Sequence, residues 1–211
     1  MAFSDFKGTN YILNWSLDLD QKWPERIRIR PIIIKTILNY FQSSKWQKIH
    51  LLELGPGAGQ LAQSVLSRLA YNFSTISYTG IDINTKLIHH TEQKLVDLGL
   101  TDLSCHRANL NEKSWCKGLP HFNLAYSFQT LHDLDGYQSL ERVYKKLYSL
   151  IQSGGLLLTA DFIVPFETDN PKKPRRFPIE VHHRLLESIG FVNFRTESKI
   201  GNLAIMTAIR L

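Results

Sequence analysis

The sequence predicts an α/β fold, a doubly wound and mostly parallel seven-stranded sheet that ends in an antiparallel hairpin. Three observations support this prediction. From residue 49 onward, uniformly apolar strand-like segments alternate with amphipathic helical segments. A glycine-rich turn joins the first of these strands to its helix. The last two strand-like segments are joined by only a few residues, which requires them to run antiparallel.

The first half of the predicted sheet contains three strands and two helices. The helix after the second strand carries Leu87, Ile88 and Leu95 on a helical spacing. Strands as uniformly apolar as these are covered on both faces, which is typical of a parallel sheet wrapped by helices. The predicted strands are residues 49–54, 77–83 and 103–107, and the predicted helices are residues 60–69 and 85–98.

The second half contains four strands and two helices. Gly154 and Gly155 are expected to end the first helix, because glycine tolerates the left-handed conformation of a helix C-terminus. Gly190 is expected to end the second helix in the same way. The predicted strands are residues 123–128, 156–164, 191–198 and 203–211, and the predicted helices are residues 136–151 and 182–189.

The most informative stretch is residues 51–62, Leu-Leu-Glu-Leu-Gly-Pro-Gly-Ala-Gly-Gln-Leu-Ala. Gly55, Gly57 and Gly59 lack a Cβ, so the backbone can take positive φ and a ligand can lie directly against it. The helix that follows points its free N–H groups at the turn, which favours a nucleotide-type ligand. A dinucleotide fingerprint needs a third glycine where Gln60 stands, which disfavours a nicotinamide dehydrogenase, and the Gly-Lys-Ser/Thr of a P-loop is absent.

With Glu53 two residues ahead of Gly55, the turn reads acidic-x-Gly-x-Gly-x-Gly. At this point the chain resembles the class I S-adenosylmethionine-dependent methyltransferases, which have a Rossmann-like fold. The resemblance extends over residues 49–211, because that family also closes its sheet with an antiparallel strand. It implies that S-adenosylmethionine is the cofactor and that Gly55, Gly57 and Gly59 lie under its methionine part. Glu53 is expected to support the turn and to reach the cofactor's ammonium through water.

Asp82 ends the second strand, 23 residues after Gly59. A carboxylate accepts two hydrogen bonds, so Asp82 is predicted to hold the two vicinal hydroxyls of the cofactor's ribose. The resemblance places Ile83 against the adenine ring. A turn aspartate without a ligand is the alternative interpretation of Asp82.

The third and fourth strand ends supply further cofactor-binding candidates. Family members often carry an aspartate after the third strand, which accepts from the adenine amino group, and Asn109 stands there in this sequence. Its amide carbonyl can accept the same bond as an uncharged group. Leu110 is expected to touch adenine, and Ser127 is the candidate at the fourth strand end.

The segment after the fourth strand, Ser-Phe-Gln-Thr-Leu-His at residues 127–132, bears on the type of reaction. It lacks the Asp/Asn-Pro-Pro-aromatic loop of amino-group DNA methyltransferases, the Pro-Cys motif of carbon-5 pyrimidine enzymes and the paired glutamates of arginine methyltransferases. It resembles the small-molecule branch of the family. His132 is therefore predicted to act as the general base. A structural imidazole at a helix start is the alternative.

The first 48 residues are expected to form a separate helical segment ahead of the cofactor-binding domain at 49–211. Residues 31–41 read as an amphipathic helix. The preceding stretch is rich in aromatic residues: Phe3, Phe6, Tyr11, Trp15 and Trp23. In the small-molecule branch such helices fold over the cofactor as a lid, while a cap packed against the sheet is the other interpretation. The two are compatible.

Composition sets the broad class. The 211 residues are 43 % hydrophobic and 21 % charged, as in a globular protein, with no apolar run long enough to span a bilayer. Two cysteines, expected as reduced thiols, and an N-terminus unlike a secretory signal are typical of a cytoplasmic enzyme. No Cys/His set has the spacing of a metal site, so no metal is expected.

The net charge of +6 raises the question of an anionic partner. Much of the excess lies in Arg26, Arg28 and Arg30 and in the proline-rich segment 169–178, which is expected to be an exposed loop. A solvated loop and a site for an anionic substrate or a phosphate backbone both remain open. Nucleic acid is the less favoured partner, since no aromatic residues are interleaved with these basic ones.

These observations predict methyl transfer from S-adenosylmethionine to a small-molecule acceptor by in-line displacement. Two alternatives stay open. One is methylation of RNA or protein, which the basic loop favours. The other is a protein that binds S-adenosylmethionine without turnover and acts as a partner of another protein, which Asn109 and the uncertain base at His132 favour. The sequence does not identify the acceptor or the oligomeric state.

Overall fold

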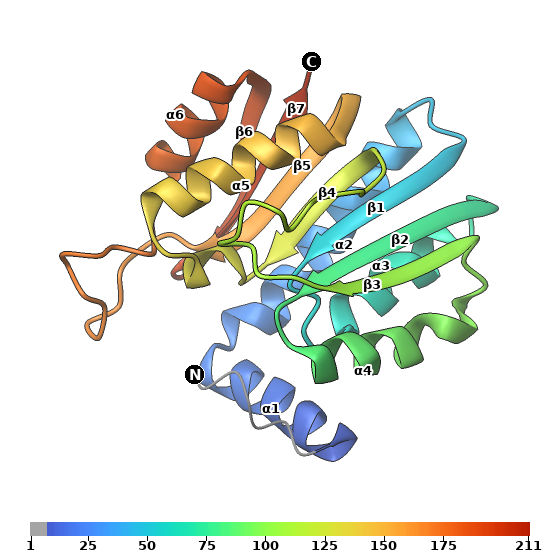
Figure 1. Cartoon of the computed structure of the whole chain (residues 1–211), viewed down its shortest axis with the longest axis horizontal. Helices are drawn as coiled ribbons and strands as arrows, with labels where there is room; N and C mark the ends of the chain where they lie inside the picture. The colour runs from blue at the N-terminus through green and yellow to red at the C-terminus, as the bar shows by residue number, and fades with distance from the viewer. Residues whose placement is uncertain (1–7) are drawn as a thin grey trace. The chain divides into compact units, whose positions relative to one another are not determined.

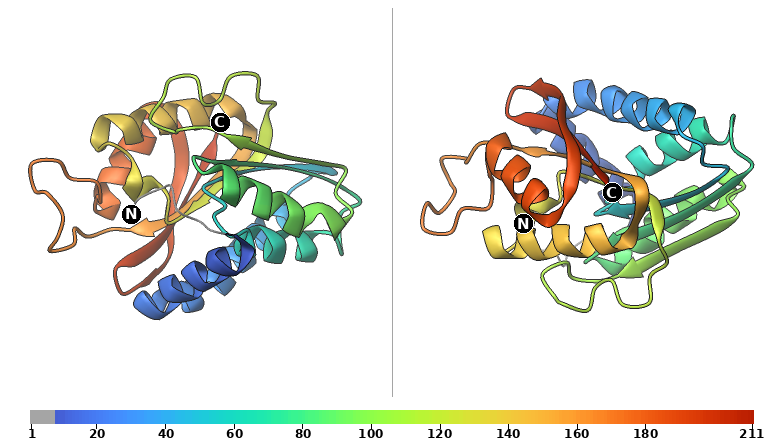
Figure 2. Two further views of the ribbon diagram at one scale, coloured as in Figure 1. Left: turned by 60° about the horizontal axis from the view of Figure 1, so that its bottom comes forward. Right: turned by 90° about the horizontal axis from the view of Figure 1, so that it is seen from above.

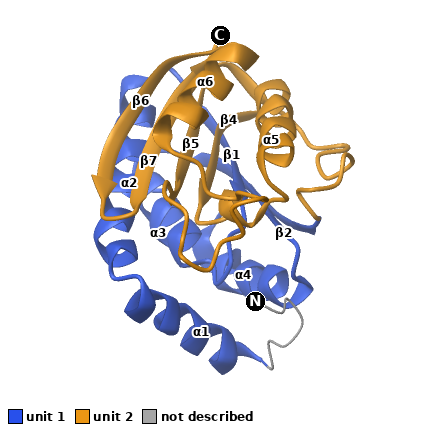
Figure 3. Cartoon of the chain, turned by 90° about the vertical axis from the view of Figure 1, so that its left-hand side faces the viewer, with its two compact units in different colours: residues 1–108 blue, residues 109–211 orange. Residues whose placement is uncertain are grey.

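The computed structural model describes residues 8–211 and has the predicted fold. The described residues hold a seven-stranded, mostly parallel sheet (Figure 1). Along the chain a helix separates consecutive strands among the first five, except that the third strand leads to the fourth through turns alone. In that part of the chain β7 is the one strand that runs against its neighbours. The chain divides into two compact units, residues 1–108 and 109–211 (Figure 3).

The first unit contains three parallel strands in the order β3-β2-β1. Leu54 pairs with Ile81, and Asp82 pairs with Arg107, so the carboxyl ends of the strands lie at one edge of the sheet. Helix α4 packs against β2 and β3, and α3 packs against α2 and α4. The elements are α1 (Thr9–Lys22), α2 (Glu25–Ser43), β1 (Lys48–Leu54), α3 (Gln60–Leu69), β2 (Thr75–Asp82), α4 (Thr85–Leu95), η1 (Val96–Leu98) and β3 (Asp102–Arg107).

The N-terminal segment contains two helices where the sequence predicted one, and the predicted helix start at residue 31 is wrong. Pro31 lies inside α2, six residues after its first residue Glu25. Proline favours a helix start because it has no N–H, but here the buried face of α2, which includes Ile29 and Ile33, extends the helix toward the N-terminus. Two of the predicted aromatic residues, Phe3 and Phe6, lie outside the described residues.

The second unit contains four strands in the order β4-β5-β7-β6. Strands β4 and β5 are parallel, and helices α5 and α6 lie side by side (Figure 2, right). The elements are β4 (Phe122–Phe128), η2 (Leu131–Asp133), α5 (Tyr137–Leu150), β5 (Ile151–Phe162), α6 (Ile179–Ile189), β6 (Phe191–Ile200) and β7 (Leu203–Arg210). Among the helices described in either unit, none combines the length and the apolar character that crossing a membrane requires.

The glycine pair at 154–155 does not end α5, contrary to the sequence prediction. Helix α5 ends at Leu150, and Ile151 is already extended, with φ −76° and ψ 137°. Both glycines lie in β5, where a Cβ on Gly155 would come within 2.9 Å of the carbonyl oxygen of Asn123. Close backbone approach, rather than a helix terminus, therefore requires glycine here. Gly190 does end α6 as predicted, with φ +112°.

Candidate functional site

The glycine turn between β1 and α3 has the conformation for which glycine is required. Gly55, Gly57 and Gly59 have φ values of 70°, 57° and 68°, in the left-handed region. The N–H of Gly55 donates to the carbonyl of Ile81 at 2.7 Å, which ties the turn to the end of β2. The hydroxyl of Thr91 on α4 donates to the carbonyl of Gly57 at 3.0 Å. Two neighbouring elements therefore hold the turn in place.

Replacing Gly59 with alanine is expected to destabilise the fold more than the same change at Gly99. Both glycines have a positive φ, 68° and 65°, so each substitution costs about 1–2 kcal/mol of backbone strain. A Cβ on Gly59 would also lie 3.0 Å from Oγ1 of Thr91, whereas a Cβ on Gly99 would have no atom of the described residues within 4 Å. Urea unfolding of both variants measures the difference. Equal decreases in the free energy of unfolding of the two variants would show that the contact with Thr91 adds no strain.

Asp82 lies at the carboxyl end of β2, beside the glycine turn. Its Oδ1 accepts from the N–H of Asn84 at 2.9 Å, and its Oδ2 accepts from the N–H of Gly57 at 3.3 Å. Burial raises the pKa of this carboxyl above its ordinary value, and the N–H groups of Asn84 and Gly57 partly offset that effect. Each carboxylate oxygen has a second lone pair, so Asp82 can accept two further hydrogen bonds from a ligand.

Glu53 is the buried partner of a tyrosine. Its side chain is 1 % exposed, and Oε2 accepts from the hydroxyl of Tyr78 at 2.6 Å. Tyr78 comes from β2 and is itself buried, and Gly80 leaves room for its ring, since a Cβ there would lie 3.1 Å from it. Glu53 therefore joins β1 to β2, and its support of the turn stays a prediction. The water-mediated contact to an ammonium stays a prediction.

Helix α1 covers part of the glycine turn with an aromatic side chain. The ring of Trp15 lies 3.5 Å from the position that a Cβ on Gly57 would take. Trp15 packs against a small buried cluster of Ile12, Ala58 and Leu87, which come from α1, the turn and α4. That the N-terminal segment folds over the cofactor as a lid stays a prediction. Trp15 is the residue that would cover the cofactor.

A polar network joins α1 and α2 to the first residue of α3. The side-chain oxygen of Gln60 accepts from the hydroxyl of Ser16 and from the guanidinium of Arg30, each at 3.0 Å. Asp20 forms ion pairs with both Arg30 and Arg26. Burial lowers the pKa of Arg26, and the hydrogen bond to Asp20 opposes that effect. Gln60, which excludes a dinucleotide fingerprint, therefore anchors the N-terminal helices beside the turn.

Within the first unit the structure brings together Glu53, the three glycines, Asp82 and Ile83, at the ends of β1 and β2. The other candidates belong to the second unit. The amide oxygen of Asn109 accepts from the N–H of Asn111 at 3.0 Å and keeps a second lone pair for a ligand. Leu110 is partly exposed. The hydroxyl of Ser127 is buried and has no hydrogen-bond partner among residues 8–211. Their contacts with a cofactor stay predictions.

His132 lies in η2, the short 3₁₀ helix that follows β4, and is held by Asp161 at the end of β5. Its Nδ1 is 2.6 Å from Oδ1 of Asp161. The N–H groups of Leu131 and His132 donate to Oδ2 of Asp161 at 2.8 and 3.2 Å, and the N–H of Phe162 donates to Oδ1 at 2.7 Å. Because a carboxylate only accepts, Nδ1 carries the proton and Nε2 keeps its lone pair when the ring is neutral.

The electrostatics of this pair favour the protonated ring. Burial lowers the pKa of His132, but the charge and hydrogen bond of Asp161 and the charge of Asp133 outweigh it, so the pKa is raised above its ordinary value. Burial raises the pKa of Asp161, but the hydrogen bonds from the imidazole and from backbone N–H groups lower it by more than burial raises it. The pKa of Asp161 is therefore below its ordinary value. The aspartate thus stabilises the imidazolium that forms when His132 takes a proton.

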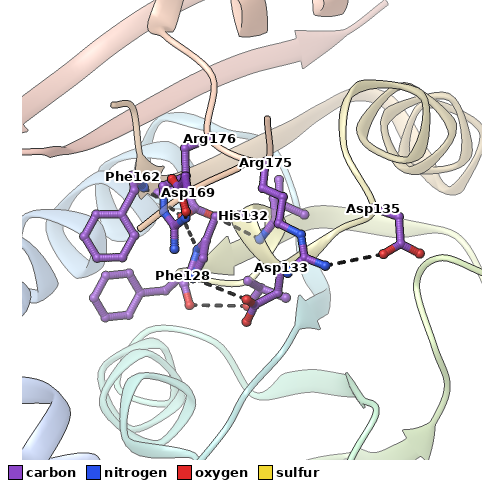
Figure 4. A network of polar contacts seen from close by, with 11 residues as sticks. Phe128, His132, Asp133, Asp135, Phe162, Asp169, Arg175 and Arg176 are labelled. Atoms are coloured by element: carbon purple, nitrogen blue, oxygen red, sulfur yellow. Dashed lines mark hydrogen bonds and ion pairs between the residues drawn. The ribbon is translucent and has the colours of Figure 1, made fainter. Parts of the chain in front are cut away.

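Two arginines from the loop between β5 and α6 lie near this histidine (Figure 4). Arg176 forms an ion pair with Asp169, and its guanidinium lies 3.8 Å from the ring centre of Phe166. Arg175 lies 3.6 Å from Asp135. A recess in the second unit is lined by Leu131, His132, Leu140, Asp161, Phe162, Arg175, Phe177 and His182.

Sequence reasoning missed several of these residues. Asp161 had a signal, since an acid in an otherwise apolar strand at its carboxyl end marks a possible site residue. The sequence gives no signal for Tyr78 or Thr91, because a tyrosine in a strand and a threonine in a helix are both common. Arg30 was noticed only as part of the net charge, and its bond to Gln60 depends on how α2 packs.

The comparison with family models matches residues 52–157 to the methyltransferase domain. This match covers half of the chain and runs from β1 into β5, so it includes the glycine turn, Asp82 and His132. No curated protein sequence is similar enough to count as a match.

Solved structures with the same fold include three methyltransferases. The CurJ carbon methyltransferase has a TM-score of 0.72 at 16 % identity, over 86 % of this chain and 54 % of that one. An O-methyltransferase family protein from Burkholderia thailandensis has a TM-score of 0.65 at 14 % identity, over 87 % of this chain and 57 % of that one. Human N-acetylserotonin methyltransferase, solved with S-adenosylmethionine, has a TM-score of 0.63 at 16 % identity, over 95 % of this chain and 56 % of that one.

This chain therefore spans a little over half the length of each of these three proteins. At such low identity they confirm the fold, while the family model identifies the family and confirms the cofactor class that the glycine turn predicted. The chain belongs to the methyltransferase-domain family.

Proposed function

We propose that this chain transfers a methyl group from S-adenosylmethionine to a small-molecule acceptor, with His132 as general base. The observation that carries the proposal is the contact between His132 and Asp161, in which a buried carboxylate fixes the ring and leaves Nε2 to act. Carbon and oxygen methyltransferases among the similar structures support a small acceptor.

The first unit fits the cofactor. Its glycine turn has no Cβ at Gly55, Gly57 and Gly59, and the left-handed backbone of each residue allows a ligand to lie close against the main chain. Asp82 has acceptor capacity for two ribose hydroxyls beside that turn. When bound, S-adenosylmethionine supplies a methyl group that its sulfonium makes electrophilic.

The second unit supplies the proton chemistry. Nε2 of His132 accepts the proton of the acceptor's hydroxyl, amine or acidic C–H while that atom attacks the methyl carbon, and the imidazolium that results is stabilised by Asp161. General-base catalysis of this kind contributes about 10²–10⁴ in rate. Correct positioning of the reactants contributes on the order of 7–11 kcal/mol, so the base is one part of the acceleration.

The rate of methyl transfer is expected to rise with pH through the pKa of His132. The neutral ring is the base, and its pKa lies above the ordinary 6.5, so the midpoint of the acid limb of kcat/KM is expected above pH 6.5. The same pair stabilises the folded chain below pH 6.5, and this contribution disappears as the pH rises through the raised pKa. A pH–rate profile measures the midpoint. A midpoint below 6.5 would contradict the ion pair as described.

Calorimetric titration with S-adenosylmethionine, its demethylated product and NAD tests the cofactor. Micromolar binding of the first two and none of NAD is expected. Incorporation of labelled methyl groups into small molecules of a cell extract then tests the acceptor class. Labelling of bulk RNA or peptides, with a strong salt dependence, would favour the RNA or protein alternative. Binding without any labelled product would favour a non-catalytic partner protein.

A further inference from the structure

A row of packed side chains connects the loop between β5 and α6 to His132. The ring of Phe162, at the end of β5, meets the imidazole edge to face, with 5.2 Å between the ring centres. Phe166 meets Phe162 in the same way at 4.7 Å. The guanidinium of Arg176 lies 3.8 Å from the ring centre of Phe166 and 5.7 Å from that of Phe162. Figure 4 shows Arg176, Phe162 and His132 gathered at one place.

Asp169 fixes the arginine at the far end of this row. Its Oδ2 accepts from the backbone N–H of Phe166 at 2.7 Å, and its Oδ1 forms the ion pair with Arg176. The side chains of Arg176 and Asp169 are 12 % and 16 % exposed, so solvent and salt screen their charges less than they screen those of surface residues. A guanidinium is attracted to the face of an aromatic ring, which adds to this attachment. Arg176 therefore has a defined place beside the rings.

The charges of this loop also act on the imidazole. Burial lowers the pKa of His132, and the carboxylates of Asp161 and Asp133 raise it. The positive charge of Arg176 opposes those two carboxylates. Burial raises the pKa of Asp169, but a backbone N–H and the charges of Arg176 and His132 lower it by more, so the carboxylate of Asp169 also interacts with the ring.

The other ionisable groups around the ring come from α5, α6 and the same loop. His182 lines the recess together with His132, and its Nδ1 lies 2.7 Å from the hydroxyl of Tyr144. Burial lowers the pKa of His182 to about 4 and raises the pKa of Tyr144, so both are uncharged near neutral pH. Arg175 is half-exposed and 3.6 Å from Asp135, so solvent screens its charge more than that of a buried group.

A general base needs both a fixed orientation and a pKa near the working pH. With a pKa far above that pH, the ring is mostly protonated and inactive, so a nearby cation keeps the neutral ring populated. We propose that Arg176 is a positioning residue: it holds Phe162 against the imidazole of His132, and its charge offsets the two carboxylates beside that ring. This proposal rests on the function proposed above. Arg176 acts through His132 and exchanges no proton itself.

An NMR titration of the imidazole groups in the full chain tests the proposal without an acceptor. The signal of His132 is the one that disappears in His132→Asn. Arg176→Met keeps an apolar contact with Phe166 but removes the charge, so the pKa of His132 is expected to rise by at least about 0.5 pH unit. Asp169→Asn keeps an acceptor oxygen but removes a negative charge, so the pKa of His132 is expected to fall. A merely structural role would not produce shifts of opposite sign.

Lys173→Met is the matched control, because it removes one positive charge from an exposed position of the same loop. A shift below about 0.2 pH unit is expected for it, since solvent and salt screen an exposed charge. Two results would overturn the proposal. One is a shift in the same direction for Arg176→Met and Asp169→Asn, and the other is a shift in Arg176→Met no larger than that in Lys173→Met.

A rate measurement then separates the charge of Arg176 from its packing. The rate is the incorporation of labelled methyl groups into the small-molecule fraction of a cell extract, measured as a function of pH. Arg176→Lys keeps the charge but loses the planar group on Phe166. The midpoint of its acid limb is expected within about 0.2 pH unit of wild type, with a maximal rate lower by about 3- to 10-fold. A maximal rate equal to wild type would overturn the positioning role.

The same profiles distinguish failure of this proposal from failure of the proposed function. The midpoints of the acid limb in Arg176→Met and Asp169→Asn are expected to follow the pKa values of His132 from the NMR titration. If those pKa values shifted in opposite directions and the rate midpoints did not follow, His132 would not be the base. That result would overturn the proposed function, whereas unshifted pKa values would overturn the role of Arg176 alone.

Discussion

Replacing His132 with alanine is expected to lower kcat by about 10²–10⁴-fold while the affinity for S-adenosylmethionine stays within about 2-fold of wild type. The variant loses Nε2, the proposed proton acceptor, but the glycine turn and Asp82 lie in the other compact unit and are untouched. Stopped-flow or radiolabel assays measure kcat, and calorimetric titration measures the affinity. A loss of both together would indicate a structural imidazole, the alternative that the sequence left open.

Three further variants sharpen this test. His121→Ala removes an exposed histidine next to β4 and is expected to leave kcat unchanged. Asp161→Asn removes the charge that raises the pKa of His132, so the acid limb of the pH profile is expected to move to lower pH as the maximal rate falls. His132→Asn keeps a donor toward Asp161, so it separates the loss of the base from the loss of that contact.

Replacing Asp82 with alanine is expected to weaken S-adenosylmethionine binding on the order of 10²–10⁴-fold. Two ribose hydroxyls lose a charged acceptor, at about 1.5–3 kcal/mol each. The N–H groups of Gly57 and Asn84 lose their acceptor in the same variant, so the free cofactor site is also less well ordered. Calorimetric titration measures the affinity, and thermal unfolding shows whether the variant is folded at the temperature of the titration.

Asp82→Asn retains one acceptor oxygen and the shape of the side chain, so an intermediate affinity is expected. Asp102→Ala is the control, because Asp102 is exposed at the start of β3, the opposite end of the strand from the turn. If a folded Asp82→Ala variant bound S-adenosylmethionine as tightly as wild type, the ribose assignment would be wrong and Asp82 would be a structural turn residue.

Most of the fold could be predicted from the sequence because its elements are marked by local chemistry. Helix α3 was predicted with the observed bounds, since the glycine turn begins it and its apolar spacing is regular. The start of β5 and the length of α2 could not be predicted. In both cases packing against distant residues, Asn123 beside Gly155 and the buried face of α2, overrides the local signal of glycine or proline.

The candidate site was predictable where a residue acts through its backbone or at a strand end. The glycine turn, Asp82 and His132 were selected as candidates in this way, and the structure shows which groups hold them, while their roles toward a ligand stay predictions. Partners that approach from another element were not predictable. Asp161 meets His132 across 29 residues, and Arg30 meets Gln60 across 30, so neither pairing leaves a periodic or spaced pattern in the sequence.

The position of Trp15 on Gly57 has a consequence for the speed of ligand exchange. A ligand that lies along the glycine turn would compete for space with this ring or lie beneath it, so we predict that the ring and its helix move when a ligand enters or leaves. The hydrogen bond from Ser16 to Gln60 and the contacts of Trp15 and Ile12 hold α1 down. Each hydrogen bond of this kind contributes about 1 kcal/mol, so opening is a modest barrier. If α1 moves in this way, the residence time of the ligand depends on the contacts of α1 as well as on the affinity of the glycine turn.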